Sequence, residues 1–140
     1  MISALKSVLN SHGAALGSLV LRVGFGGFMA LNHGWPKLMG FADKSDKFAA
    51  FLPLPSPLSL SLAIVGELLC AVLIVVGLGT RMAAVPAVIT MLVAAFGAHR
   101  DDAFGDGEHA LLYALGFTAI GLMGPGRFSI DALRGKGRTG

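Results

Sequence analysis

The chain has 140 residues, of which 54% are hydrophobic and only 14% charged, and its mean hydropathy is +0.74. About a quarter of the residues of a soluble domain are charged, and a chain this short cannot hide so much apolar surface in an interior of its own. The composition therefore excludes an ordinary soluble domain and predicts an integral membrane protein whose partner is the lipid bilayer. The net charge of +3 comes from basic residues near the ends of a hydrophobic chain rather than from a basic stripe, so we expect no nucleic-acid partner.

Four apolar segments predict four transmembrane helices, at residues 14–31, 58–78, 82–98 and 109–124. A helix needs about 20 residues to cross the hydrocarbon core, and a backbone in lipid must satisfy its own hydrogen bonds. The fourth segment is short and crosses only if it continues into Pro125 and Phe128, or if the bilayer thins locally. A signal peptide is the alternative for the first segment, but Arg22 within its apolar run argues against it. The expected fold is one all-α domain over residues 1–140, an integral membrane four-helix bundle.

The connections between these segments have distinct patterns. An outer loop is expected at residues 32–57, and its stretch 43–52 has the composition of a short amphipathic helix lying on the membrane surface. Glycines at 77 and 79, followed by a threonine N-cap at 80, predict a tight antiparallel hairpin between the second and third helices. A basic tail is expected at residues 127–140.

Lysine and arginine are more frequent on one side of the predicted helices than on the other. One side carries six of them: Lys6, Arg81, Arg127, Arg134, Lys136 and Arg138. The other side carries four: Lys37, Lys44, Lys47 and Arg100. Basic residues accumulate in cytoplasmic loops, so we expect both the N- and the C-terminus in the cytoplasm.

Arg22 and Glu67 are the strongest functional signals, because each lies near the centre of an apolar segment, where a charge costs about 2.5 kcal/mol or more. Small residues flank both charges on the same helix faces: Ser18, Gly26, Ala63 and Ala71. We therefore expect Arg22 and Glu67 to meet and neutralise each other between neighbouring helices. The pair is either a proton, quinone or substrate site, or a structural ion pair that fixes the helix register. In the first case Glu67 is the titrating group, since arginine stays protonated.

Three histidines, His33, His99 and His109, lie at the outer ends of the first, third and fourth helices. Acidic residues follow at positions 101–108, so His99, His109 and Asp102 are candidate ligands for a divalent metal, and the imidazoles are candidate axial ligands of a haem. The spacing matches no standard metal signature, and the alternative is a hydrated acidic rim between short helices.

The single cysteine, Cys70, excludes an intrachain disulfide framework. It lies in an apolar run, as expected for a packing residue. It also lies about one helical turn from Glu67, which leaves open a carboxylate-assisted thiol.

Several short motifs, in order and at fixed spacing, resemble the DoxX family of small bacterial membrane proteins from about residue 21 to residue 133. These motifs are Leu21-Arg22, Asn32-His33-Gly34-Trp35-Pro36-Lys37, Gly66-Glu67-Leu68-Leu69, Gly77-Leu78-Gly79-Thr80-Arg81 and Gly124-Pro125-Gly126-Arg127-Phe128-Ser129-Ile130-Asp131. The family's recognisable positions are occupied here by Arg22, His33, Lys37, Glu67, Arg81, Arg127 and Asp131. The resemblance implies a four-helix protein of the bacterial inner membrane. It also implies relatives that include a subunit associated with thiosulfate:quinone oxidoreductase, and others linked to thiol and oxidative-stress systems.

The leading hypothesis is a membrane subunit or accessory factor of such a redox system, rather than an enzyme on its own. Arg22, Glu67, His33 and Lys37 would bind a quinone headgroup or a small anionic sulfur compound, with Glu67 or His33 relaying protons. The expected partner is a second copy of the chain or a redox protein. Two alternatives are a small transporter gated by the buried charges, and a membrane anchor that recruits soluble proteins through the basic residues 134–138.

Overall fold

The computed structural model describes residues 1–50 and 53–136, and throughout these ranges the regular structure is helical, with no strand. The all-α prediction is thus confirmed. Three helical runs in this part of the chain are long and apolar enough to cross a membrane: Ile2–Met39, Ser56–Val76 and Thr80–Ala98. The fourth apolar helix, Glu108–Met123, is shorter, at 16 residues.

Each of the three long runs is an α-helix that contains, or ends in, one π-helical turn. In the first, α1 (Ile2–Met29) continues through η1 (Ala30–Gly34) into α2 (Trp35–Met39). In the second, α4 (Ser56–Ile64) and α5 (Cys70–Val76) flank η2 (Val65–Leu69). In the third, α6 (Thr80–Val93) ends in η3 (Ala94–Ala98). The remaining helices are α3 (Phe41–Lys44), the 3-10 turn η4 (Arg100–Asp102), α7 (Glu108–Met123) and α8 (Ile130–Lys136).

The first helix is longer at both ends than its apolar segment. It begins at Ile2 rather than near residue 14, because no proline precedes Pro36 and the polar residues of its first turns are compatible with a helix. Pro36 does not end it either: it lies in α2, which directly follows the π-helical turn η1 inside the continuous run Ile2–Met39. The amphipathic helix expected over residues 43–52 is not formed as such, because α3 ends at Lys44 and turns follow. Residues 51 and 52 of that stretch lie outside the described part of the chain.

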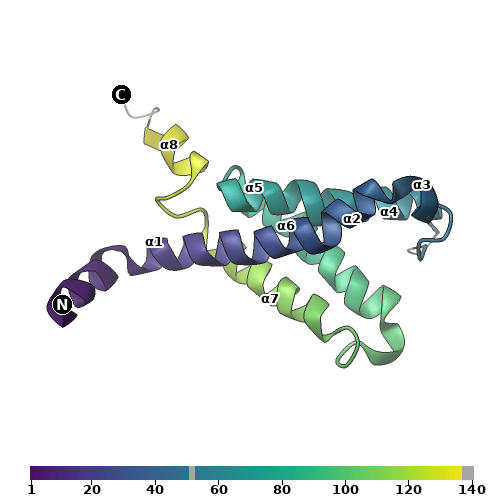
Figure 1. Ribbon diagram of the computed structural model, residues 1–140, viewed down its shortest axis with the longest axis horizontal. Coiled ribbons are helices and arrows are strands. Elements are labelled where there is room, and N and C mark those ends of the chain that lie inside the picture. Colours follow the sequence, from purple (N-terminus) through teal and green to yellow (C-terminus); the bar gives the residue numbers. More distant parts are fainter. Residues whose placement is uncertain (51–52, 137–140) are drawn as a thin grey trace.

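The helices pack through small residues. Figure 1 shows α1 and α2 lying along α4 and α5, while α6 and α7 form an adjacent pair that diverges from them toward one end. A Cβ at Gly26 would lie 2.9 Å from the carbonyl oxygen of Ala71, and a Cβ at Gly34 would lie 2.6 Å from that of Glu67. Only glycine therefore permits this approach of the first helix to the second, as is common in membrane helix packing. The buried core is rich in alanine and is filled by Phe117 and Ile120 of α7.

The C-terminal segment packs against the hairpin between α5 and α6, at one end of the molecule. Gly77 and Gly79 adopt left-handed conformations, with φ of 72° and 58°, which glycine accommodates without strain. The Asp131 carboxylate accepts hydrogen bonds from the backbone N–H groups of Gly79 and Thr80, at 2.9 and 3.1 Å. Asp131 therefore caps the first turn of α6 from a distant part of the chain.

Candidate functional site

The three π-helical turns place titratable side chains around one region of the molecule. His33 lies in η1, Glu67 lies in η2, and His99 follows η3 directly. A π-helical turn inserts an extra residue into an α-helix and is frequent at functional sites. Because η1 packs against η2, and α7 packs against η3, these three positions face a common space.

Glu67 forms an ion pair with Lys37 of α2, through Oε2 and Nζ. The Glu67 side chain is 6% exposed and that of Lys37 is 21% exposed. The pair depends on the close contact at Gly34, which brings the end of the first helix against the backbone of Glu67. The charge of this buried carboxylate is thus neutralised by a lysine whose side chain is partly exposed.

The expected contact between Arg22 and Glu67 is wrong: among the described residues, no ion pair joins them, and each has other partners. The helix register gives the reason. Gly26 packs at Ala71 and Gly34 packs at Glu67, so Glu67 lies level with a residue 12 positions beyond Arg22. At a rise of ~1.5 Å per residue, the two charges are about 18 Å apart along the first helix.

Arg22 instead joins three parts of the chain at the opposite end. Its side chain is fully buried, and Nη1 donates to the carbonyl oxygens of Ile74 and Val75, at 3.4 and 3.1 Å. Nη2 donates to the carbonyl oxygen of Phe128, and Asp131 lies near enough for its charge to act on the guanidinium. The final carbonyl groups of a helix lack partners within the helix and carry its negative dipole end. Arg22 therefore has the contacts of a structural residue that fastens the C-terminal segment to the end of α5.

A row of aromatic side chains runs from the buried ion pair toward the loop after η3. The His33 ring stacks on that of His109 with centroids 5.8 Å apart, and the His109 ring lies 6.3 Å from that of His99. Tyr113 of α7 packs edge-on against His33, at 5.7 Å. Glu67 and Lys37 both act electrostatically on His33, so the histidine row and the ion pair form one polar group.

The trio of His99, His109 and Asp102 is not assembled as a metal site. Asp102 turns back into its own loop, where its carboxylate accepts hydrogen bonds from the N–H groups of Gly105 and Asp106. Within residues 1–50 and 53–136, no group of three histidine, cysteine, aspartate or glutamate side chains is placed to hold a metal ion.

A cavity of about 1110 Å³ lies beside this polar group. We call one group of its lining residues the polar end: His33, Lys37, Glu67, His99, His109 and Tyr113. The rest of the lining is mainly apolar, and Leu62, Ile89 and Phe96 in it are half-exposed. The cavity is therefore open rather than enclosed, and α4 and α6 form part of its wall. Arg22 and Cys70 are not among its lining residues.

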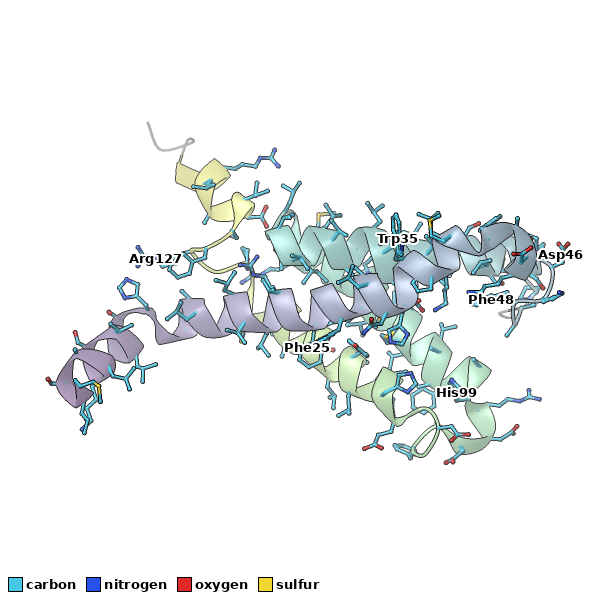
Figure 2. All side chains as sticks on the ribbon, viewed as in Figure 1. Phe25, Trp35, Asp46, Phe48, His99 and Arg127 are labelled. Carbon is cyan, nitrogen blue, oxygen red and sulfur yellow. The ribbon has the colours of Figure 1, made fainter. Side chains whose placement is uncertain are left out.

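The two polar regions lie toward opposite ends of the molecule. Figure 2 shows Arg127 at the end where α8 lies, and Asp46, Phe48 and His99 toward the other end. Of the residues expected to bind substrate, the structure brings His33, Lys37 and Glu67 to the cavity and leaves Arg22 outside it.

The family model described as DoxX matches residues 17–100. The chain belongs to the DoxX family. It is also 36% identical over 108 residues to the inner membrane protein YphA of Escherichia coli (strain K12), an alignment that covers 70% of this chain and 76% of that protein. No solved structure matches the chain. Together with the three helices that are long and apolar enough to cross a membrane in the described part of the chain, these similarities make it a multi-pass inner-membrane protein of the DoxX family.

Sequence reasoning missed two features of this DoxX protein's cavity. One is Tyr113, whose signal was its position four residues after His109, which puts both on one face of a helix. The other is the ion pair between Glu67 and Lys37: the sequence marks Lys37 as a candidate ligand-binding residue but gives no indication of this pairing. Cys70 is buried and free, as a packing residue would be.

Proposed function

We propose that this DoxX protein is a membrane subunit or accessory factor of a redox system, and that its cavity holds a quinone. The observation that carries this proposal is the composition of the open cavity, which combines a polar end with apolar, partly exposed walls. A quinone has the matching shape, because it joins a headgroup with two carbonyl oxygens to an apolar tail. A small sulfur oxyanion would use Lys37 but none of the apolar lining, so we favour the quinone.

The side chains at the polar end suit the chemistry of a quinone headgroup. Lys37 can donate a hydrogen bond to a quinone carbonyl while remaining near Glu67. Conversion of a quinone to a quinol takes up two electrons and two protons. We assign proton exchange to Glu67 and His33, which lie at the cavity and interact with each other. The electrons would come from a redox partner protein.

We also propose that all four apolar helices cross the membrane, with both termini in the cytoplasm. The 16 residues of α7 span about 24 Å, and the segment that follows would complete the crossing. Six of the lysines and arginines then lie on the cytoplasmic side and four on the other, as counted from the sequence. In this orientation the polar end of the cavity lies toward the outer leaflet.

Binding of a short-tailed quinone to the purified protein in nanodiscs tests the proposed function. Quinones quench indole fluorescence, and Trp35, the single tryptophan, lies two residues from Lys37 and provides the signal. We expect saturable binding that weakens about tenfold or more in Glu67→Gln and in Lys37→Met, as for loss of a charged hydrogen bond. Thr118→Val is the matched control, because Thr118 is exposed and its hydroxyl bonds to Ala114 of its own helix.

Two results would overturn the proposal. One is the absence of saturable quinone binding to the wild-type protein. The other is binding that neither the Glu67 nor the Lys37 variant weakens. If thiosulfate or proton flux into liposomes is found without quinone binding, the protein is a transporter instead.

A further inference from the structure

The first turns of α1 extend beyond the packed helices. Residues 1–11 are all exposed, whereas Ser18 is buried and donates a hydrogen bond from its Oγ to the carbonyl oxygen of Gly124. That carbonyl follows the last residue of α7, so the packed body ends about level with Ser18. Figure 1 shows the segment before it projecting away at the end labelled N.

This projecting segment has two chemically different faces. Its large apolar residues recur at the spacing of one helix side and are 47–70% exposed: Ile2, Leu5, Val8 and Leu9. The opposite side carries polar residues and one cation: Ser3, Lys6, Ser7, Asn10 and Ser11. A helix of this pattern left in water would expose a continuous apolar face.

We propose that residues 2–11 lie along the membrane surface, with their apolar face in the acyl boundary of an anionic leaflet. The length of the first helical run supports this arrangement, since 38 residues span about 57 Å and the hydrocarbon core is about 30 Å thick. The apolar face also continues the lipid-facing surface of α1, where Val20 is 68% exposed. Amphipathic helices with a basic polar face bind membranes in this orientation.

The charges at this end favour an anionic lipid surface. Lys6 is exposed, and the exposed arginines at the same end are Arg81, Arg127 and Arg134. Arg81 belongs to this end because it packs at Gly124, and Arg127 and Arg134 flank the segment that Arg22 holds. Each basic residue near an anionic surface contributes about 1 kcal/mol of attraction.

A bend between the surface segment and the membrane-crossing part is required, and two glycines are placed for it. Gly13 and Gly17 have nothing within 4 Å of an added Cβ, so neither is needed for helix packing. Glycine lowers the cost of departing from helical geometry. Just before them, the Ser11 hydroxyl donates to the Ser7 carbonyl oxygen at 2.8 Å, a bond that often accompanies helix bending. Residues 11–17 therefore form the expected hinge.

Site-directed spin labelling of the full chain in nanodiscs tests the orientation. Cys70 is the single cysteine, so a Cys70→Ala background allows labels at Leu5 and Leu9 on the apolar face and at Ser3 and Ser7 on the polar face. We expect the first two labels to collide mainly with oxygen dissolved in lipid, and the other two mainly with a water-soluble nickel complex. The labels at Leu5 and Leu9 should also lie at equal depth, whereas a helix that continues straight along the membrane normal would separate them by about 6 Å.

The controls fix the scale and test the lipid charge. A label at Val20 reports lipid exposure, and one at Asp101 of η4, whose side chain is 99% exposed, reports water. Lys6→Glu should shift the Leu5 label toward water when phosphatidylglycerol is present, but not in phosphatidylcholine alone. Nickel access to all four labels, or a depth difference of about 6 Å between the Leu5 and Leu9 labels, would overturn the surface orientation. An equal effect of Lys6→Glu in both lipids would overturn the preference for anionic lipid. None of these outcomes depends on quinone binding.

Discussion

The ion pair between Lys37 and Glu67 should be strongly coupled in stability. Glu67 is almost completely buried, and Lys37 is its charged partner, so removing either side chain alone leaves the other charge uncompensated at a largely buried position. Loss of one partner of a buried pair costs about 3–5 kcal/mol. Glu67→Gln leaves the Lys37 side chain, which is 21% exposed, without its partner, so we expect this variant to lie at the lower end, at about 3 kcal/mol.

A double-mutant cycle measures this coupling. Unfolding in mixed micelles, followed by loss of helical circular dichroism, gives the free energy of unfolding of Lys37→Met, Glu67→Gln and the double variant. The double variant replaces both charges, so it should recover at least about 2 kcal/mol relative to the sum of the single changes. The pair between Arg100 and Asp101 is the control: it is 78% and 99% exposed at 4.0 Å and should show no measurable coupling. If the costs of the Lys37 and Glu67 changes add within about 0.5 kcal/mol, the pair does not interact as described.

Two further predictions concern the opposite end of the molecule. Arg22→Lys should lower the free energy of unfolding by about 2 kcal/mol, because one ammonium cannot reach both the end of α5 and Phe128. Quinone affinity should stay within about twofold of wild type. Unchanged stability with lost quinone binding would show instead that Arg22 belongs to the ligand site. Burial raises the pKa of Asp131, but the hydrogen bonds from Gly79 and Thr80 and the charge of Arg134 outweigh it and hold that pKa below its ordinary value of 3.8. Asp131→Ala should therefore cost about 1 kcal/mol at neutral pH. This difference in the free energy of unfolding between variant and wild type should be constant above about pH 5 and disappear as the pH falls below about 4, through the lowered pKa of Asp131. A difference that persists at low pH would show that the carboxylate charge is not its source.

The apolar pattern predicts helices well because lipid leaves the backbone few alternatives. Residues 58–78 and 82–98 overlap the observed runs Ser56–Val76 and Thr80–Ala98 almost completely. The ends of the first helix were less predictable, since hydropathy marks where lipid lies and not where helical hydrogen bonding stops. Ile2 and Met39 lie well outside the apolar segment of 14–31, yet no residue between them breaks the helix.

The partners of buried charges could not be predicted in the same way. The expectation for Arg22 and Glu67 assumed that the centre of an apolar segment marks membrane depth. Register between helices depends instead on where small residues permit close approach. Those contacts, at Gly26 and Gly34, join residues that are 45 and 33 positions apart, and their distance is known only in the folded chain. The π-helical turns were also beyond reach, because they differ from α-helix by a single hydrogen-bond shift and leave no hydrophobic period of their own.

The separation of the two charged regions has a consequence for function. Arg22 is surrounded by backbone carbonyl groups of α5 and of the C-terminal segment, which cannot exchange protons, so its region is suited to holding parts of the chain together. Glu67, His33 and Lys37 have side-chain partners that can change protonation, and they line a cavity whose shape is set by three irregular helix turns. Single π-helical turns are frequent at functional sites, and His33 and Glu67 each lie in one. Proton exchange is therefore expected at the polar end of the cavity, while the Arg22 end holds the C-terminal segment against α5.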